Sequence, residues 1–317
     1  MELKEENSRV DISVVIPLYN EQESLGELAK ELEITLIAMA KSFELIFIDD
    51  GSTDKSFETL LKLKEDIPSI KIIQFQANYG KSAALSAGFS IVKGDYVITM
   101  DADLQDEPKE IPRLINKLEE GYDLVSGWKK KRNDPFTKKL ASKIFNRITS
   151  ITTGVKLHDH NCGLKAYRKT VVKNLSVYGE LHRYLPPLSN ALGFKVTEIE
   201  VTHHARKYGR SKYGLWRFFS GFFDLLTVLF LTRFTHRPLH LFGIIGLCFF
   251  FLGVVINLYL TIQKYYYGIG LGDRPLLFLG VLLIIVGFQS FSMGFLAEMI
   301  TKEKKSEDNY IIKRIDN

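Results

Sequence analysis

Two long apolar runs near the C-terminus constrain the fold of this chain more than any other feature. Leu239–Ile262 and Pro275–Ala297 contain no Asp, Glu, Lys or Arg. Each run exceeds the roughly 20 residues that a helix needs to cross the apolar core of a bilayer. Soluble helices of that length without a polar face are rare, so a pair of buried core helices is the weaker alternative. The runs predict a two-helix transmembrane anchor at residues 238–300, and their recurrent glycines would allow close helix packing.

Basic residues flank these runs and predict their orientation. The flanking residues are Arg233, His236, Arg237, Lys302, Lys304 and Lys305. The loop between the runs contains only Lys264 and Arg274, beside Asp273. The positive-inside rule therefore places both chain ends, including a tail at 301–317, in the cytoplasm. Met1–Arg9 is charged and lacks the apolar segment of a signal peptide, so the N-terminal domain at 1–213 is also expected in the cytoplasm, with the anchor in the inner membrane.

Residues 214–237 form a different kind of segment. Leu215–Leu231 is apolar and aromatic, but it contains Arg217 and Asp224. We interpret it as an amphipathic helix that lies in the membrane interface. A third span is the alternative, and it would place the N-terminal domain outside the cell.

The first two-thirds of the chain alternate between short branched apolar runs and segments with helical periodicity. The expected strands are Ile12–Ile16, Leu45–Ile48, Ile70–Phe75, Tyr96–Met100, Leu124–Val125 and Val196–Val201. The expected helices are Glu23–Ala40, Lys55–Lys64, Ser82–Val92 and Glu110–Glu120, the first capped by Asn20 with Glu23. This pattern predicts an α/β domain with a parallel sheet covered on both faces. Two separated cysteines favour a reducing compartment, and a net charge of +5 is too mild to suggest a nucleic-acid partner.

Polar clusters follow four of the expected strands. They are Pro17–Glu21, Asp49–Asp54, Asn78–Lys81 and Asp101–Asp106. Because ligands of parallel sheets bind beyond the carboxyl ends of the strands, these clusters predict one site. Any single acidic turn would more often be a helix cap.

The sharpest of these clusters is Asp101-Ala102-Asp103. Two carboxylates one residue apart can hold a hard divalent cation that also binds diphosphate oxygens, and Mg²⁺ and Mn²⁺ both fit this donor set. Lys81 follows Gly80 at a helix start, where charge and backbone donors suit a diphosphate. A P-loop is excluded because Phe75 stands where that motif requires glycine.

The motifs resemble glycosyltransferase family two and its GT-A fold. The resemblance rests on Val15–Glu21, Ile48–Asp54 and Asp101–Gln105. Asn161–Arg168 and Arg206–Tyr213 are similar to the dolichol-phosphate mannose synthase branch, especially its bacterial polyprenyl-phosphate glucosyltransferases with two C-terminal spans. The resemblance covers nearly the whole chain in order.

The resemblance implies a role for each matching position. The nucleotide-sugar would be bound by Pro17, Tyr19, Asn20, Glu21, Asp49, Asp50, Asn78, Lys81, Asp101 and Ala102. The metal would be surrounded by Asp101, Asp103 and Gln105. The acceptor phosphate would be bound by Lys129, Arg132, Arg206, Arg210, Ser211 and Lys212. The implied catalytic residues are Asp103, Asp159, Arg206 and Lys212, with Asp159 as the candidate base. Many relatives have an arginine directly after Gly-Ser of the fifth strand, and either Lys129 or Arg132 would replace it here.

The implied reaction is inverting transfer of a hexosyl group to undecaprenyl or another polyprenyl phosphate, for modification of cell-surface glycans. UDP-glucose is the expected donor, while GDP-mannose, a UDP-N-acetylhexosamine and an aminopentose nucleotide remain alternatives. A processive polysaccharide synthase would require a Gln-x-x-Arg-Trp motif and more spans, which the sequence lacks. A non-catalytic membrane scaffold is the remaining alternative, and a homo-oligomer such as a tetramer is compatible with the resemblance.

The acceptor itself suggests how the catalytic roles are divided. A phosphate monoester is already largely anionic near neutral pH, since its second pKa is about 6. Such a nucleophile has little need of a general base, so positioning and charge neutralisation become the main tasks. We therefore expect Arg206 and Lys212 to matter more for turnover than Asp159.

Overall fold

The computed structural model describes residues 10–130, 136–204, 207, 227–230, 238–268, 270 and 274–304. The chain divides into two compact units, Met1–Val228 and Leu229–Asn317. Each unit is described by itself. The expected interfacial helix at 215–231 lies outside the described residues except for 227–230.

The first unit is built on a seven-stranded mixed sheet with the order β3-β2-β1-β4-β6-β5-β7. Its strands are β1 (Ile12–Leu18), β2 (Phe43–Asp49), β3 (Ile70–Gln74), β4 (Tyr96–Thr99), β5 (Leu124–Trp128), β6 (Lys165–Arg168) and β7 (Val196–Glu200). All expected strands are present, but the expectation of a wholly parallel sheet was wrong. β6 was not predicted, and it runs antiparallel to both of its neighbours, β4 and β5.

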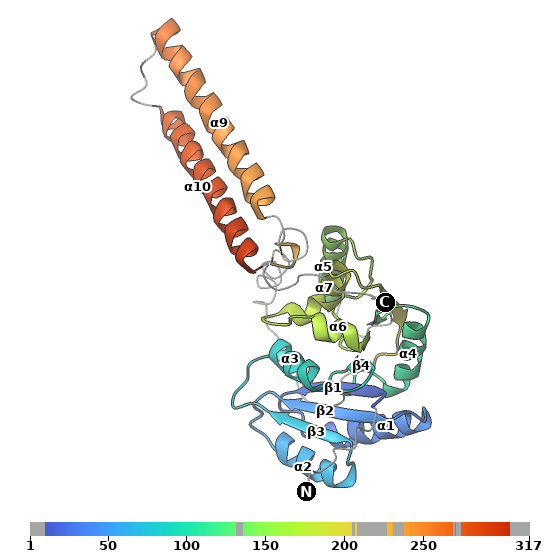
Figure 1. Ribbon diagram of the computed structural model, residues 1–317. Coiled ribbons are helices and arrows are strands. Elements are labelled where there is room, and N and C mark those ends of the chain that lie inside the picture. Colours follow the sequence, from blue (N-terminus) through green and yellow to red (C-terminus); the bar gives the residue numbers. More distant parts are fainter. Residues whose placement is uncertain are drawn as a thin grey trace. The chain divides into compact units, whose positions relative to one another are not determined.

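Helices cover both faces of this sheet. They are α1 (Leu25–Ala38), α2 (Ser56–Asp66), α3 (Lys81–Ile91), α4 (Ile111–Glu119), α5 (Phe136–Thr153), α6 (Lys169–Asn174) and α7 (Leu185–Ala191), with short 3₁₀ helices at Pro108–Glu110 and Leu181–Tyr184. Successive residues of β1 face opposite sides, as the pleat of a strand requires. Val14 and Ile16 join the core under α1, α2 and α4, whereas Val15 packs with residues of α3, α6 and α7. In Figure 1, α3 and α2 lie on opposite sides of β1–β3.

The expected Asn20 cap of the first helix was wrong. Ser24 occupies the N-cap position of α1, without a side-chain capping bond. Asn20 instead adopts a φ of 54°, and its Oδ1 accepts a hydrogen bond of 2.7 Å from the backbone N–H of Thr53. This hydrogen bond joins the loop after β1 to the loop after β2. Asparagine suits the position because its short amide side chain tolerates the left-handed conformation.

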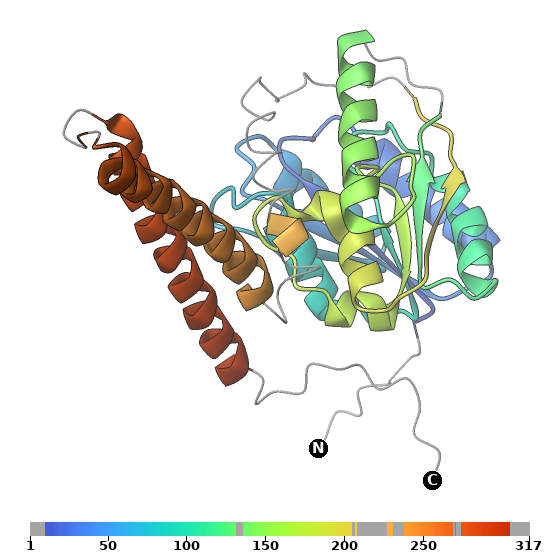
Figure 2. The same cartoon turned by 90° about the horizontal axis from the view of Figure 1, so that it is seen from above.

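The second unit contains two long apolar helices that pack side by side, α9 (Pro238–Tyr267) and α10 (Pro275–Lys304) (Figure 2). Both are long and apolar enough to cross a membrane, as the sequence predicted. Three exposed tyrosines, Tyr265–Tyr267, end α9, and aromatic rings of this kind are enriched where spans meet the membrane surface.

Glycines set the distance between α9 and α10. A Cβ added to Gly253 would lie 2.6 Å from the carbonyl oxygen of Gly280, and one added to Gly246 would lie 2.6 Å from that of Gly287. Small residues at such contacts allow the close helix approach on which packing in membranes depends.

This contact yields a prediction about the stability of the helix pair. We expect Gly253→Ala to destabilise it by about 1–3 kcal/mol, because a backbone carbonyl cannot move aside without separating the helices. Gly243→Ala is the matched control, since its added Cβ would have ordinary contacts of 3.7 Å or more. Thermal unfolding of the full chain in detergent measures the difference. Equal melting temperatures for the two variants would contradict it.

Candidate active site

The carboxyl ends of β1, β2 and β4 meet at one edge of the sheet because these strands pair in parallel. The loops that follow are tied together by side chains. The backbone N–H groups of Asn20 and Glu21 donate to the hydroxyls of Ser52 and Ser56 over 2.8 and 3.0 Å. Gly51 has a φ of +71°, and a Cβ there would lie 2.5 Å from the backbone of Ala77. Only glycine allows the loop after β2 to approach the loop after β3 so closely.

Asp50 organises the loop that leads into α3. Its carboxylate accepts hydrogen bonds from the N–H groups of Tyr79 and Gly80, at 2.7 and 2.9 Å. Burial raises the pKa of Asp50 although both hydrogen bonds oppose this change. The neighbouring Asp49 is fully buried, and its Oδ2 has no hydrogen-bond partner among the described residues. The structure thus brings together the sequence-predicted nucleotide-binding loops at 17–21, 49–54 and 78–81.

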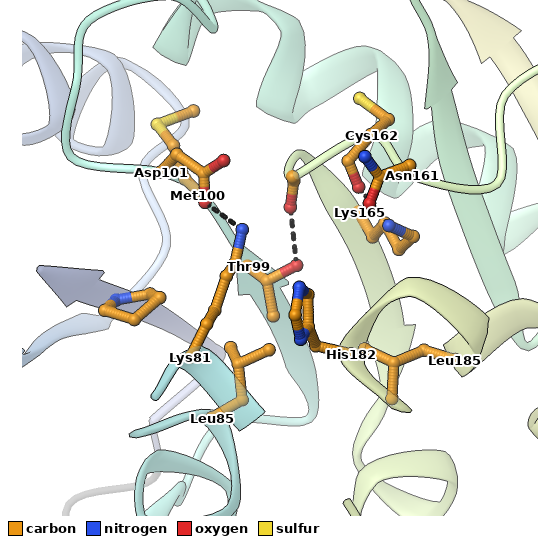
Figure 3. A pocket seen from close by; sticks show the side chains of 12 residues that line it. Lys81, Leu85, Thr99, Met100, Asp101, Asn161, Cys162, Lys165, His182 and Leu185 are labelled. Atoms are coloured by element: carbon orange, nitrogen blue, oxygen red, sulfur yellow. Dashed lines mark hydrogen bonds and ion pairs between the residues drawn. The ribbon is translucent and has the colours of Figure 1, made fainter. Parts of the chain in front are cut away.

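A small pocket lies at the end of β4 (Figure 3). Lys81, in the first turn of α3, forms an ion pair there with the carboxylate of Asp101. The pocket is also lined by Thr99, Asn161, Lys165 and His182. Its volume of about 10 Å³ is room for about one water molecule, so a larger ligand requires these side chains to move.

A turn before β6 packs directly against Asp101. A Cβ added to Gly163 would lie 2.5 Å from Oδ2 of Asp101, and the Thr99 hydroxyl donates to the Gly163 carbonyl over 2.9 Å. Glycine is therefore required at 163 to leave space for the carboxylate.

We expect Gly163→Ala to displace Asp101 and to lower kcat/KM by on the order of 10-fold or more, since misplacing a group by about 1 Å can cost 10²-fold. Gly26→Ala in α1 is the matched control, because a Cβ there would meet nothing within 4 Å. Steady-state kinetics with a check of folding by circular dichroism measures the effect. A fully active, folded Gly163→Ala variant would contradict this role of the turn.

Asp101 and Asp103 are suited to hold a divalent cation. Both follow β4, and Leu104 has a φ of 58°, so the chain turns sharply within the predicted metal loop. Asp103 is 8% exposed, and its Oδ1 accepts the backbone N–H of Gln105 over 3.3 Å. The described residues offer no cluster of three acidic, histidine or cysteine ligands. The donor set fits Mg²⁺ or Mn²⁺, which use few carboxylates and complete their shell with water and phosphate oxygens.

Lys129 has a role that the sequence did not predict. Its ammonium lies 2.7 Å from Asp106, and its side chain is only 12% exposed. Nδ1 of His203 lies 3.5 Å from the same carboxylate. Burial alone would raise the pKa of Asp106, but Lys129 and His203 hold it well below its usual range. In this structure Lys129 holds Asp106 at the end of the metal loop. Its binding of an acceptor phosphate stays a prediction. Arg132 lies outside the described residues.

The basic segment, residues 203–213, begins beside the metal loop. His203 forms an antiparallel bridge with Asp106, and the His204 N–H donates to the Gln105 carbonyl over 2.8 Å. Further along, Lys207 is ion-paired with Glu27 in the first turn of α1, at 2.7 Å. Arg206, Arg210, Ser211 and Lys212 lie outside the described residues. The structure therefore brings the start of the basic segment to the site.

Lys165 and His182 line the pocket, and the buried Asp159 lies close enough to act on the charge of Lys165. Asp159 is 1% exposed, and its Oδ1 accepts the N–H of Asn161 over 3.2 Å. Its role as a base stays a prediction. Sequence reasoning assigned no role to Lys165, which lies within a quoted motif, or to His182. Nδ1 of His182 lies 3.0 Å from the Ser82 hydroxyl at the start of α3. No local pattern indicates that contact, because the two residues are far apart in the sequence.

Comparisons with known proteins agree with this geometry. The sequence model described as "Glycosyl transferase family 2" matches residues 13–176. Dodecaprenyl-phosphate galacturonate synthase of Rhizobium johnstonii is 39% identical over 96% of this chain and 93% of that protein. Undecaprenyl-phosphate 4-deoxy-4-formamido-L-arabinose transferase of Klebsiella pneumoniae is 37% identical, again over 96% and 93%.

A solved structure shows the same fold at low sequence identity. Glucosyl-3-phosphoglycerate synthase from Mycobacterium tuberculosis, in complex with Mn²⁺, UDP and phosphoglyceric acid, has a TM-score of 0.55 and 18% identity. The match covers 70% of this chain and 78% of that one.

Proposed function

This chain belongs to glycosyl transferase family 2, and from that premise we propose that it transfers a glycosyl group from a sugar nucleotide to a polyprenyl phosphate at a membrane. The carrying observation is the junction between the Asp101–Asp106 loop and the start of the basic segment at His203 and His204. A carboxylate site for a metal-bound diphosphate and a cationic segment for a second phosphate thus share one edge of the sheet. Both relatives reported above are named for polyprenyl-phosphate acceptors and match along nearly their whole length.

The donor side would be held by groups that the structure brings together. The loops joined by Asn20, Gly51 and Asp50 would bind the nucleoside. Lys81 and the backbone donors at the start of α3 would bind the diphosphate. Asp101 and Asp103 would hold Mg²⁺ or Mn²⁺, which neutralises charge on the departing diphosphate. The M. tuberculosis enzyme was solved with Mn²⁺ and UDP, which supports a divalent metal in this fold.

The reaction would be a single displacement that inverts the anomeric carbon. The anionic oxygen of the lipid phosphate forms a bond to that carbon while the bond to the diphosphate oxygen breaks. The nucleoside diphosphate leaves, and an α-linked donor gives a β-linked lipid product. Because the nucleophile is already anionic, the protein's task is to hold two phosphate groups in line and to offset their repulsion. The basic residues Arg206 and Lys212 are proposed for the lipid phosphate.

Several donor sugars are compatible with this site. UDP-glucose is the donor suggested by the sequence. The names of the relatives specify galacturonate and 4-deoxy-4-formamido-L-arabinose, so an acidic sugar and a substituted pentose are tested beside glucose. The two apolar helices would anchor the chain in the inner membrane, with the catalytic domain and both ends in the cytoplasm.

The test uses the full chain in detergent or membranes with labelled sugar nucleotides and undecaprenyl phosphate. A labelled product that partitions into chloroform, and that requires the lipid's phosphate group, is the expected result. The unphosphorylated polyprenol is the control acceptor. Absence of labelled lipid with every sugar nucleotide would overturn the proposal and would favour a non-catalytic scaffold.

A further inference from the structure

A buried lysine lies at the inner side of the pocket beside Asp101. Lys165 is the first residue of β6, and it pairs with Thr99, the last residue of β4. β6 runs antiparallel to β4, so its first residue lies at the edge where β4 ends. Lys165 is 2% exposed and lines the pocket with Asp101 and Lys81 (Figure 3).

Within the part of the chain that the structure describes, the ammonium of Lys165 has no carboxylate at ion-pair distance. It donates a hydrogen bond to the backbone carbonyl of Cys162, and within the described part of the chain it forms no ion pair. Burial lowers the pKa of Lys165, and the charge of Lys81 contributes to this change, although Asp159 and Asp101 oppose it. A buried charge without a counter-ion is destabilising unless a ligand supplies that counter-ion.

The acidic groups nearest to Lys165 are engaged elsewhere or act on it without an ion pair. Lys81 and Asp101 neutralise one another in their ion pair. Burial raises the pKa of the Cys162 thiol to about 12, so this group is neutral. Among the described residues Lys165 therefore has no carboxylate within ion-pair distance, although Asp101 and Asp159 act on its charge from further away.

The order of the strands indicates which part of the donor reaches Lys165. The nucleoside loops follow β1, β2 and β3, the diphosphate residues follow β4, and β6 is the next strand in the sheet. A sugar nucleotide laid along this edge, with its diphosphate at Asp101 and Asp103, would extend its sugar toward the start of β6. The diphosphate already has Lys81 and the start of α3, and the proposed lipid phosphate site is the basic segment at 206–212.

On the basis of the proposed function, we propose that Lys165 binds a carboxylate on the donor sugar, so that the preferred donor is a nucleotide-linked hexuronic acid. The carboxylate would supply the missing counter-ion inside the pocket. A neutral hexose would leave the ammonium buried without one, and this difference is the source of discrimination.

The experiment compares UDP-glucuronate and UDP-galacturonate with UDP-glucose and UDP-galactose, using the full chain and undecaprenyl phosphate. The wild type is expected to favour an acidic donor in kcat/KM by on the order of 10²-fold, the range of hydrogen bonds to charged groups. Lys165→Met should lower kcat/KM for the acidic donor by a similar factor and change that for the neutral donors less than about threefold. Lys165→Arg should keep part of the preference because it keeps the charge. Lys173→Met is the matched control, since Lys173 also donates to backbone carbonyls, those of Phe89 and Ser90, but is itself exposed.

Several outcomes would overturn the inference. If the wild type itself favours neutral donors in kcat/KM, the inference fails before any variant is made. An equal loss for all donors in Lys165→Met would assign Lys165 to the diphosphate or to the fold. A loss confined to the KM of the lipid would assign it to the acceptor phosphate. Calorimetric binding of UDP-glucuronate, UDP-glucose and UDP to wild type and Lys165→Arg decides the matter even if Lys165→Met does not fold. If no donor yields labelled lipid, the proposed function fails, while this binding comparison still tests Lys165 separately.

Discussion

Replacing Asp103 by asparagine is expected to lower turnover about 10³-fold and to leave the fold intact, since metal-assisted stabilisation of a leaving group contributes several kcal/mol and each 1.36 kcal/mol is about tenfold in rate. The asparagine fills the same space at a position that is 8% exposed. It removes one of the two carboxylates that are proposed to hold the metal. The described residues offer no cluster of three His, Cys, Asp or Glu ligands, so Asp101 would be the one carboxylate left to hold the cation, beside the expected ligand Gln105, the diphosphate and water.

The measurement is kcat at saturating donor and lipid, together with the Mn²⁺ concentration that gives half-maximal activity. This concentration should rise strongly in Asp103→Asn. Asp66→Asn is a matched control, because Asp66 is exposed at the end of α2 and far along the chain from the site. Chelation of the wild type by EDTA should abolish activity, and added Mg²⁺ or Mn²⁺ should restore it. An Asp103→Asn variant with more than about a tenth of wild-type turnover would argue against the metal site.

The proximity of the loops expected to bind the donor was predictable because parallel strands align their carboxyl ends. The register that pairs Leu18 with Asp49 places the two loops after β1 and β2 side by side. Polar clusters after four of the strands were therefore enough to predict one site. Branched residues and helical spacing similarly indicated most strands and helices of the first unit, and the absence of charge indicated α9 and α10.

β6 could not be predicted, for a physical reason. Its residues, Lys165–Arg168, are few and begin and end with a basic residue, so they show none of the apolar pattern of a buried strand. The antiparallel direction depends on how the chain returns after α5, which no local pattern specifies. Since β6 carries Lys165 to the edge, the pocket beside Asp101 was also missed.

The ion pair of Lys129 depends on a long-range contact, and its predicted binding of an acceptor phosphate stays a prediction. Its position after β5 suggested an accessible cation for an acceptor phosphate. In the structure Asp106, from the loop after β4, takes up that charge at 2.7 Å. The contact between His182 and Ser82 arises in the same way, from elements that only the tertiary fold brings together.

Lys212→Ala is expected to damage the reaction more than Asp159→Asn. The acceptor phosphate has a second pKa of about 6, so its oxygen needs no strong base near neutral pH. Removing Asp159's charge should then cost about tenfold or less, below the 10²–10⁴-fold typical of an essential general base. Removing a cation that holds the phosphate in line should lower kcat/KM for the lipid by on the order of 10²–10³-fold.

The comparison depends on separating catalysis from metal binding and from folding. Asp159 is buried and its carboxylate accepts the N–H of Asn161, so the asparagine variant needs a melting curve and a Mn²⁺ titration beside its kinetics. Lys195→Ala serves as a control for Lys212→Ala, because Lys195 is exposed and its contact with Asp123 is made by the backbone N–H, which the variant keeps. If a folded, metal-competent Asp159→Asn variant loses more turnover than Lys212→Ala, proton transfer limits the reaction. In that case the lipid phosphate reaches the site protonated, and Asp159 is the group that must remove its proton.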